Sequence, residues 1–208
     1  MKVVSHLSLE GFSNTYVIAS DDNPRCIVVD PGSMDADLLT VFLKNGIEPG
    51  FVLVTRAEKH HTAGLSTMQK VYQPIVYGHK SLDPAVDPQE QSAGNDPAEN
   101  LVEYRRLDIP GFEVRAITFP GAWIDGTMYI VGDVLFPGPM LSAGGLREVD
   151  AGYPRALLIE ALTTVFSSLP KSTWIFPAYG PPTTIQVELR SNPSLLRPVE
   201  HHVLEETD

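Results

Sequence analysis

The chain has little cysteine, no long apolar run and no large basic cluster. Its one cysteine, Cys26, cannot form an internal disulfide and lies in an apolar stretch, so we expect a core residue rather than a reactive thiol. No stretch approaches the roughly 18 apolar residues of a membrane span, and residues 1–6 lack the apolar segment of a secretion signal. We therefore expect a cytoplasmic protein that does not bind membranes.

Positive charge is also scarce, because 15 Lys and Arg stand against 26 Asp and Glu, giving a net charge of -11. Binding to nucleic acid depends on clustered Lys and Arg, so nucleic acid is not an expected partner. Much of the acidity lies in residues 82–103 and 197–208. We predict a solvent-exposed acidic loop and a C-terminal tail, and leave open whether the loop covers a binding site.

Several catalytic signatures are absent from the 208 residues: a glycine-rich phosphate loop, a serine-nucleophile elbow and zinc-knuckle spacing. The apolar fraction of 43% is ordinary for a globular protein. Length and composition together predict one compact domain over residues 1–208.

The most informative segment that is present is Thr55-Arg56-Ala57-Glu58-Lys59-His60-His61. It directly follows the apolar run 51–54, which is typical of a buried strand. Polar residues at the carboxyl end of a strand commonly form the functional site of an α/β protein. Glu58, His60 and His61 have side chains of the kinds that bind metals, although all three come from one short segment.

Other segments extend this pattern along the chain and together carry a family resemblance. They are Asn14-Thr15-Tyr16-Val17-Ile18, Val28-Val29-Asp30-Pro31-Gly32, Phe119-Pro120-Gly121-Ala122, the run 132–139, Ala143-Gly144-Gly145-Leu146-Arg147, and 179–185 followed by Glu188 and Asn192-Pro193. In this order they resemble the metallo-β-lactamase superfamily, specifically its short glyoxalase II-like branch, the hydroxyacylglutathione hydrolase-like proteins. The resemblance implies an α/β fold: a four-layer αβ/βα sandwich of two mixed sheets flanked by helices.

The resemblance also identifies the positions at which the family binds two metals. Its motif THxHxDH falls on residues 55–61, and its later ligands fall on TPGH, LFTGD and HGP. Only His61 matches; the other positions hold Arg56, Glu58, His60, Ala122, Pro139 and Tyr179. A shifted alignment would place Asp133 instead of Pro139 at the bridging position, but the spacing from Ala122 favours Pro139.

These replacements predict that the binuclear metal site is lost. Arg has no lone pair, Ala and Pro have no side-chain donor atom, and Tyr is a poor ligand unless deprotonated. We expect ion pairs of Arg56 with Glu58 or Asp30 in place of the metals. Trp123, next to Ala122, either fills the emptied space or offers a ligand surface, and Tyr179 either donates a hydrogen bond into the cleft or packs there.

Two functions follow as hypotheses. The first is a non-catalytic or diverged relative of the glyoxalase II-like hydrolases without a cofactor, with a small-molecule ligand in the vestigial cleft. The second is an altered hydrolase of thioesters or small esters with a single Zn, Fe or Mn ion on Glu58, His60 and His61. The sequence leaves open whether the protein is an enzyme and whether it forms a homo-oligomer.

Capping residues and periodicity predict the helices. Ser33 or Asp35 caps a helix that Gly46 ends, with the apolar positions Leu38, Leu39, Phe42 and Leu43 on one face. Further helices are expected over 64–71 and from Pro154 to Pro170. Residues 174–176 read as a short strand, and Thr183 with Gln186 forms a capping-box pattern for a last helix.

Overall fold

The structure is a computed structural model that describes residues 1–78, 102–119, 126–146 and 155–196. Nearly all of the predicted acidic loop, the whole C-terminal tail, and Ala122 and Trp123 lie outside the described residues.

The first sheet contains five strands in the order β1-β2-β3-β4-β5. The β1–β2 and β2–β3 pairs are antiparallel, whereas the β3–β4 and β4–β5 pairs are parallel. The strands are β1 (Lys2–Leu7), β2 (Asn14–Ser20), β3 (Asn23–Val29), β4 (Glu48–Leu53) and β5 (Ile75–Tyr77).

The second sheet contains six strands in the order β13-β12-β9-β8-β7-β6, and only the β9–β12 pair is parallel. A short 3-10 turn, η1, and a two-stranded ribbon of β10 and β11 follow β9. The bounds are β6 (Glu103–Ile109), β7 (Phe112–Thr118), β8 (Thr127–Val131), β9 (Val134–Phe136), η1 (Gly138–Met140), β10 (Leu141–Ser142), β11 (Gly145–Leu146), β12 (Trp174–Ile175) and β13 (Thr183–Thr184).

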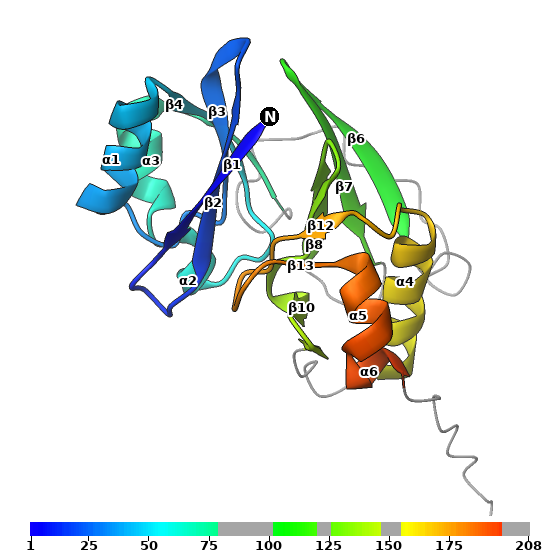
Figure 1. Ribbon diagram of the computed structural model, residues 1–208. Helices are drawn as coiled ribbons and strands as arrows, with labels where there is room; N and C mark the ends of the chain where they lie inside the picture. The colour runs from blue at the N-terminus through cyan, green and yellow to red at the C-terminus, as the bar shows by residue number, and fades with distance from the viewer. Residues whose placement is uncertain (79–101, 120–125, 147–154, 197–208) are drawn as a thin grey trace, which may run out of the picture.

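The helices lie outside the two sheets (Figure 1). They are α1 (Ala36–Asn45), α2 (Lys59–Thr62), α3 (Leu65–Tyr72), α4 (Arg155–Ser167), α5 (Ile185–Ser191) and α6 (Pro193–Leu196). Among the described residues, none of these helices is both long and apolar enough to cross a membrane.

Three buried clusters account for the four layers. Because strand side chains alternate between faces, β3 sends Ile27 and Val29 to the space between the sheets and Val28 to the opposite side. There Val28 packs with Leu38 and Phe42 of α1, and a third cluster joins the second sheet to α4 and α5. The predicted arrangement of two mixed sheets flanked by helices is confirmed.

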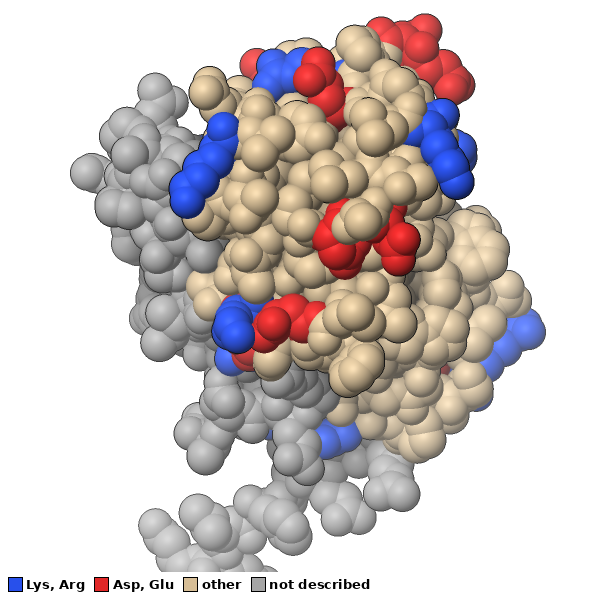
Figure 2. All heavy atoms as spheres, turned by 90° about the vertical axis from the view of Figure 1, so that its left-hand side faces the viewer, with Lys and Arg blue, Asp and Glu red and all other residues tan. Residues whose placement is uncertain are grey.

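Helix α1 buries fewer of its apolar residues than the sequence predicted. In α1, Leu38 and Phe42 are buried against the first sheet, but Leu39 is 36% and Leu43 81% exposed. A helix resting on a flat sheet buries one stripe, and residues one position further round the helix lie beside the contact rather than in it. Figure 2 shows the side of the molecule that carries α1 and α3, where acidic and basic side chains are interspersed among uncharged ones.

The predicted capping box is displaced by one residue. Thr184, not Thr183, is the N-cap of α5, and its hydroxyl accepts a hydrogen bond from the N–H of Val187 at 3.3 Å. Thr183 donates instead to the buried carboxylate of Glu188 at 2.8 Å. Two adjacent threonines fit the same capping pattern, and the burial of Glu188 decides which one caps.

At α1 the alternative between Ser33 and Asp35 is resolved in favour of Asp35. Its Oδ1 accepts from the N–H of Leu38 at 3.0 Å, while Oδ2 lies 2.7 Å from the Ser33 hydroxyl and 3.0 Å from Nε2 of His6. Partial burial alone would raise the pKa of Asp35, but these three contacts outweigh it and hold the pKa below its ordinary value. The cap therefore ties α1 to strand β1.

We expect Asp35→Ala to lower the free energy of unfolding by about 1 kcal/mol at neutral pH, the usual effect of losing a helix cap. Because the folded-state pKa of Asp35 is depressed, the ionised group stabilises the fold above its unfolded pKa of about 4, and this stabilisation disappears as the pH falls through the folded pKa. Urea unfolding at several pH values measures both effects. Asp37→Ala, in the same helical turn but not the cap, is the control; equal losses for the two variants would contradict the assignment.

Candidate functional site

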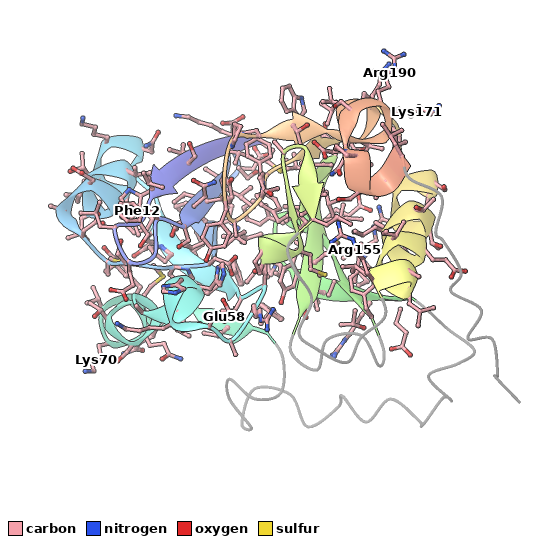
Figure 3. All side chains as sticks on the ribbon, turned by 90° about the horizontal axis from the view of Figure 1, so that it is seen from below. Phe12, Glu58, Lys70, Arg155, Lys171 and Arg190 are labelled. Atoms are coloured by element: carbon pink, nitrogen blue, oxygen red, sulfur yellow. The ribbon has the colours of Figure 1, made fainter. Side chains whose placement is uncertain are left out.

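Loops from both sheets meet where strands β3, β4, β9 and β12 end. The N–H of Thr127 donates to the carbonyl of Thr55 at 2.9 Å, and the N–H of Ala178 donates to the carbonyl of Gly138 at 3.0 Å. From the other side, the N–H of Asn14 donates to the carbonyl of Ala178 at 2.7 Å. Figure 3, which views the molecule from below, shows Glu58 at the junction of the two halves.

Asp30, directly after β3, is the centre of this junction. It is 2% exposed, and its carboxylate accepts from the N–H of Thr55 at 2.7 Å and from the Thr55 hydroxyl at 2.6 Å. Its backbone has φ 50, in the left-handed region that Asp and Asn tolerate better than most residues. The hydroxyl of Thr15 donates to the Asp30 carbonyl at 2.6 Å, which holds this turn against β2.

His61, in α2, is completely buried beside Asp30. Its Nδ1 lies 3.2 Å from Oδ2 of Asp30, an ion-pair distance, although the ring is not aligned for a regular hydrogen bond. Nε2 is buried and lacks a hydrogen-bond partner among the described residues. The ring packs edge-on against half-buried Tyr179, with centroids 5.9 Å apart and an interplanar angle of 75°. Asp30, His61 and Tyr179 therefore lie next to one another.

Arg56 and Glu58 form the predicted ion pair. Nε of Arg56 lies 2.9 Å from Oε1 of Glu58, and the two side chains are 12% and 28% exposed. Glu58 is the N-cap residue of α2, so the ion pair lies at the N-terminus of that helix. A mostly buried guanidinium thus stands in the loop that follows β4.

His60 has different neighbours from His61. Its ring lies against Gly11, in the loop between β1 and β2, so closely that a Cβ at position 11 would overlap it. The Ser13 hydroxyl donates to the His60 carbonyl at 2.7 Å, and Lys59 pairs with Glu10 at 2.7 Å. The hydrogen bond from Lys59, together with its charge, lowers the pKa of Glu10. His60 therefore packs under this loop while His61 faces Asp30.

The metal-binding residues suggested by the sequence are thus not brought to one point. Among the side chains in the described ranges, no group of three His, Cys, Asp or Glu residues is arranged to hold a metal ion. Glu58 is occupied by Arg56, and the two histidines have different neighbours.

The structure also separates Pro139 from Asp133. Gly138 adopts φ 61 and lies so close to the Thr55 side chain that a Cβ would overlap it, which places Pro139 at the junction. Asp133 is exposed in the turn at the other end of β9, where its neighbour Gly132 lies near Met1. Pro139, not Asp133, is therefore on the side of the site.

A second buried carboxylate, Glu188, supports the loops of the second sheet. It accepts from the Thr183 hydroxyl and the Asn192 amide, both at 2.8 Å, and from the N–H of Gly144 at 3.1 Å. All three donors belong to the motif segments of the sequence, so this part of the pattern stabilises the scaffold. The contributions of Thr15 and Thr55 were not predicted; their only signal was a polar residue inside or directly after an apolar strand.

Two comparisons with characterised proteins are informative at the level of sequence. The chain is 25% identical over 174 residues to hydroxyacylglutathione hydrolase of Albidiferax ferrireducens, covering 83% of this chain, and 25% identical over 175 residues to that of Klebsiella pneumoniae, also covering 83%. It spans 65% and 64% of the length of these relatives. No protein-family profile matches the chain.

Solved structures match the fold of this chain over more than nine-tenths of its length. A crystal structure of the BLEG-1 B3 metallo-β-lactamase superposes with a TM-score of 0.76 at 25% identity, covering 94% of this chain and all of that one. ETHE1 from Myxococcus xanthus gives 0.72 at 22% identity over 93% of this chain and 84% of its own. TTHA1623 in a di-iron-bound form gives 0.68 at 23% identity, covering 93% and 99%.

We expect Asp30→Ala to destabilise the protein by about 2–4 kcal/mol, because it leaves two buried donors of Thr55 and the His61 ring without their acceptor. Asp30→Asn should be milder, since Asn tolerates the left-handed backbone and keeps one acceptor oxygen. Chemical unfolding of both variants measures the difference. If the two losses were equal, the carboxylate network would not be what holds this turn.

Proposed function

We propose that this chain, which has the metallo-β-lactamase fold and is similar in sequence to hydroxyacylglutathione hydrolases, has lost the family's binuclear metal site. It acts as a non-catalytic or functionally diverged protein whose cleft takes a small molecule. The observation that carries this proposal is the Arg56–Glu58 ion pair in the segment where the resemblance places the first metal ligands.

The side chains at the other positions where the resemblance places metal ligands also support the loss of the metal site. A catalytic zinc typically needs about three protein ligands and an open position for water. Arg56 and Pro139 supply no lone pair, and His60 packs under Gly11. His61 is the one described residue that keeps both the ligand type and an inward position. The residues present do not fit two metals.

Arg56 provides what the metals would otherwise supply to this loop, a positive charge. A guanidinium stays charged at all physiological pH values, and here it faces a carboxylate at 2.9 Å with little exposure to water. Buried carboxylates need a compensating donor or cation, and Asp30 obtains its own from Thr55 and His61. The two carboxylates at this loop are therefore each compensated by groups of the protein itself.

A cytoplasmic location remains part of the proposal.

Cys26 is fully buried, and burial raises the pKa of its thiol to about 12, so it stays protonated and unreactive at neutral pH.

One observation favours the alternative, a hydrolase with a single metal. Metal-bound histidines usually direct their other ring nitrogen at a carboxylate, and His61 directs Nδ1 at Asp30 while Nε2 is unpaired. Such a metal would find few further ligands among the described residues, since Glu58 and His60 are held elsewhere.

Elemental analysis distinguishes the two functions. We expect protein produced with added zinc, iron and manganese, then dialysed without chelator, to retain less than about a tenth of a metal ion per chain, because a structural or catalytic site needs three or four ligands. About one tightly held ion per chain, together with thioester hydrolysis that a chelator abolishes, would establish the hydrolase instead.

We expect Arg56→Ala to lower the free energy of unfolding by about 1–3 kcal/mol, because it leaves a partly buried Glu58 without its cation. The matched control is Lys59→Ala, which breaks the exposed pair with Glu10 in the same segment and should leave the stability almost unchanged, because water screens that pair. Thermal and urea unfolding measure both. An Arg56→Ala variant as stable as the control would show that the ion pair does not replace a metal structurally.

A further inference from the structure

We infer that His61 is a specificity-determining acceptor at the junction of the two sheets: its Nε2 receives a hydrogen bond from a small, uncharged molecule that carries an O–H or N–H group. The inference rests on the proposed function, because a metal ion on Nε2 would use the same lone pair.

The tautomer of His61 follows from its neighbour. A carboxylate only accepts hydrogen bonds, and that of Asp30 already accepts two from Thr55. The ring nitrogen that faces it at 3.2 Å, Nδ1, must therefore carry a proton. In the neutral ring this leaves Nε2 as a bare acceptor, so the missing partner is a donor.

Burial makes the missing partner significant. His61 has no exposed surface, and Nε2 has no hydrogen bond to any residue that the structure describes. A buried polar atom left unsatisfied destabilises a protein, and most such atoms in native proteins are paired. His60 differs, since its ring packs under a loop of the fold rather than at the junction of the two sheets.

The surroundings define the kind of donor. The carboxylates of Asp30 and Glu58 are each matched by partners within the protein, so no further charge is required of a ligand. Tyr179 is half-buried and offers a ring edge-on to His61, which suits an aromatic or aliphatic neighbour. A small aromatic or aliphatic alcohol has the required chemistry.

Phenol and anisole form a matched pair of probes, since they share the ring and only phenol has an O–H. We expect nitrogen-detected NMR of the full-length protein to show the Nδ1–H tautomer of His61, and phenol to shift the Nε2 signal. Phenol should bind about tenfold more tightly than anisole, the factor expected for one buried hydrogen bond. His61→Phe should abolish this preference, whereas the control His6→Gln should retain it.

Two results would overturn the inference and leave the proposed function intact: an Nε2–H tautomer, or a metal-free protein in which phenol leaves the Nε2 signal unchanged because a buried water occupies the site. A stoichiometric metal bound to Nε2 would instead overturn the proposed function itself. If His61→Phe does not fold, the response of the Nε2 signal in the unmodified protein decides the matter.

Discussion

The junction of the two sheets depends on the carboxylate of Asp30. Its two hydrogen bonds to Thr55 join the end of β3 to the end of β4, and the carbonyl of Thr55 accepts from Thr127 in the second sheet. His61 packs onto the same carboxylate. One buried anion thus orders two strands, a short helix and the contact between the two halves, because each donor would otherwise be buried without a partner.

On the proposed loss of the metal site, this arrangement would explain how the fold is kept without the metal ligands. In a binuclear site the cations hold the loops together, so replacing their ligands would leave the loops unsupported. Here Arg56 pairs with Glu58, and Glu188 is satisfied by Thr183, Asn192 and Gly144. Supports of this kind use donors of the chain itself, and they stabilise the loops independently of any bound ion.

The elements could be predicted where local chemistry decides them. Asp35 caps α1 and Gly46 ends it in a left-handed conformation, as their residue types indicate. Predictions from periodicity alone were less secure: Leu39 and Leu43 lie outside the stripe that α1 buries, and the N-cap of α5 is Thr184. In both cases the deciding factor is a neighbouring layer that the sequence does not show.

The sequence by itself determined the fold and placed Arg56 near two candidate carboxylates, Glu58 and Asp30, because strand patterns, motif order and charge are local properties. Only the tertiary structure decided that Arg56 pairs with Glu58, that His60 and His61 have different neighbours, and that Nε2 of His61 has no partner among the described residues. These depend on which loops meet in space. Gly11, Asp30 and Thr55 are distant in the chain, and packing between the two sheets brings them around one short helix.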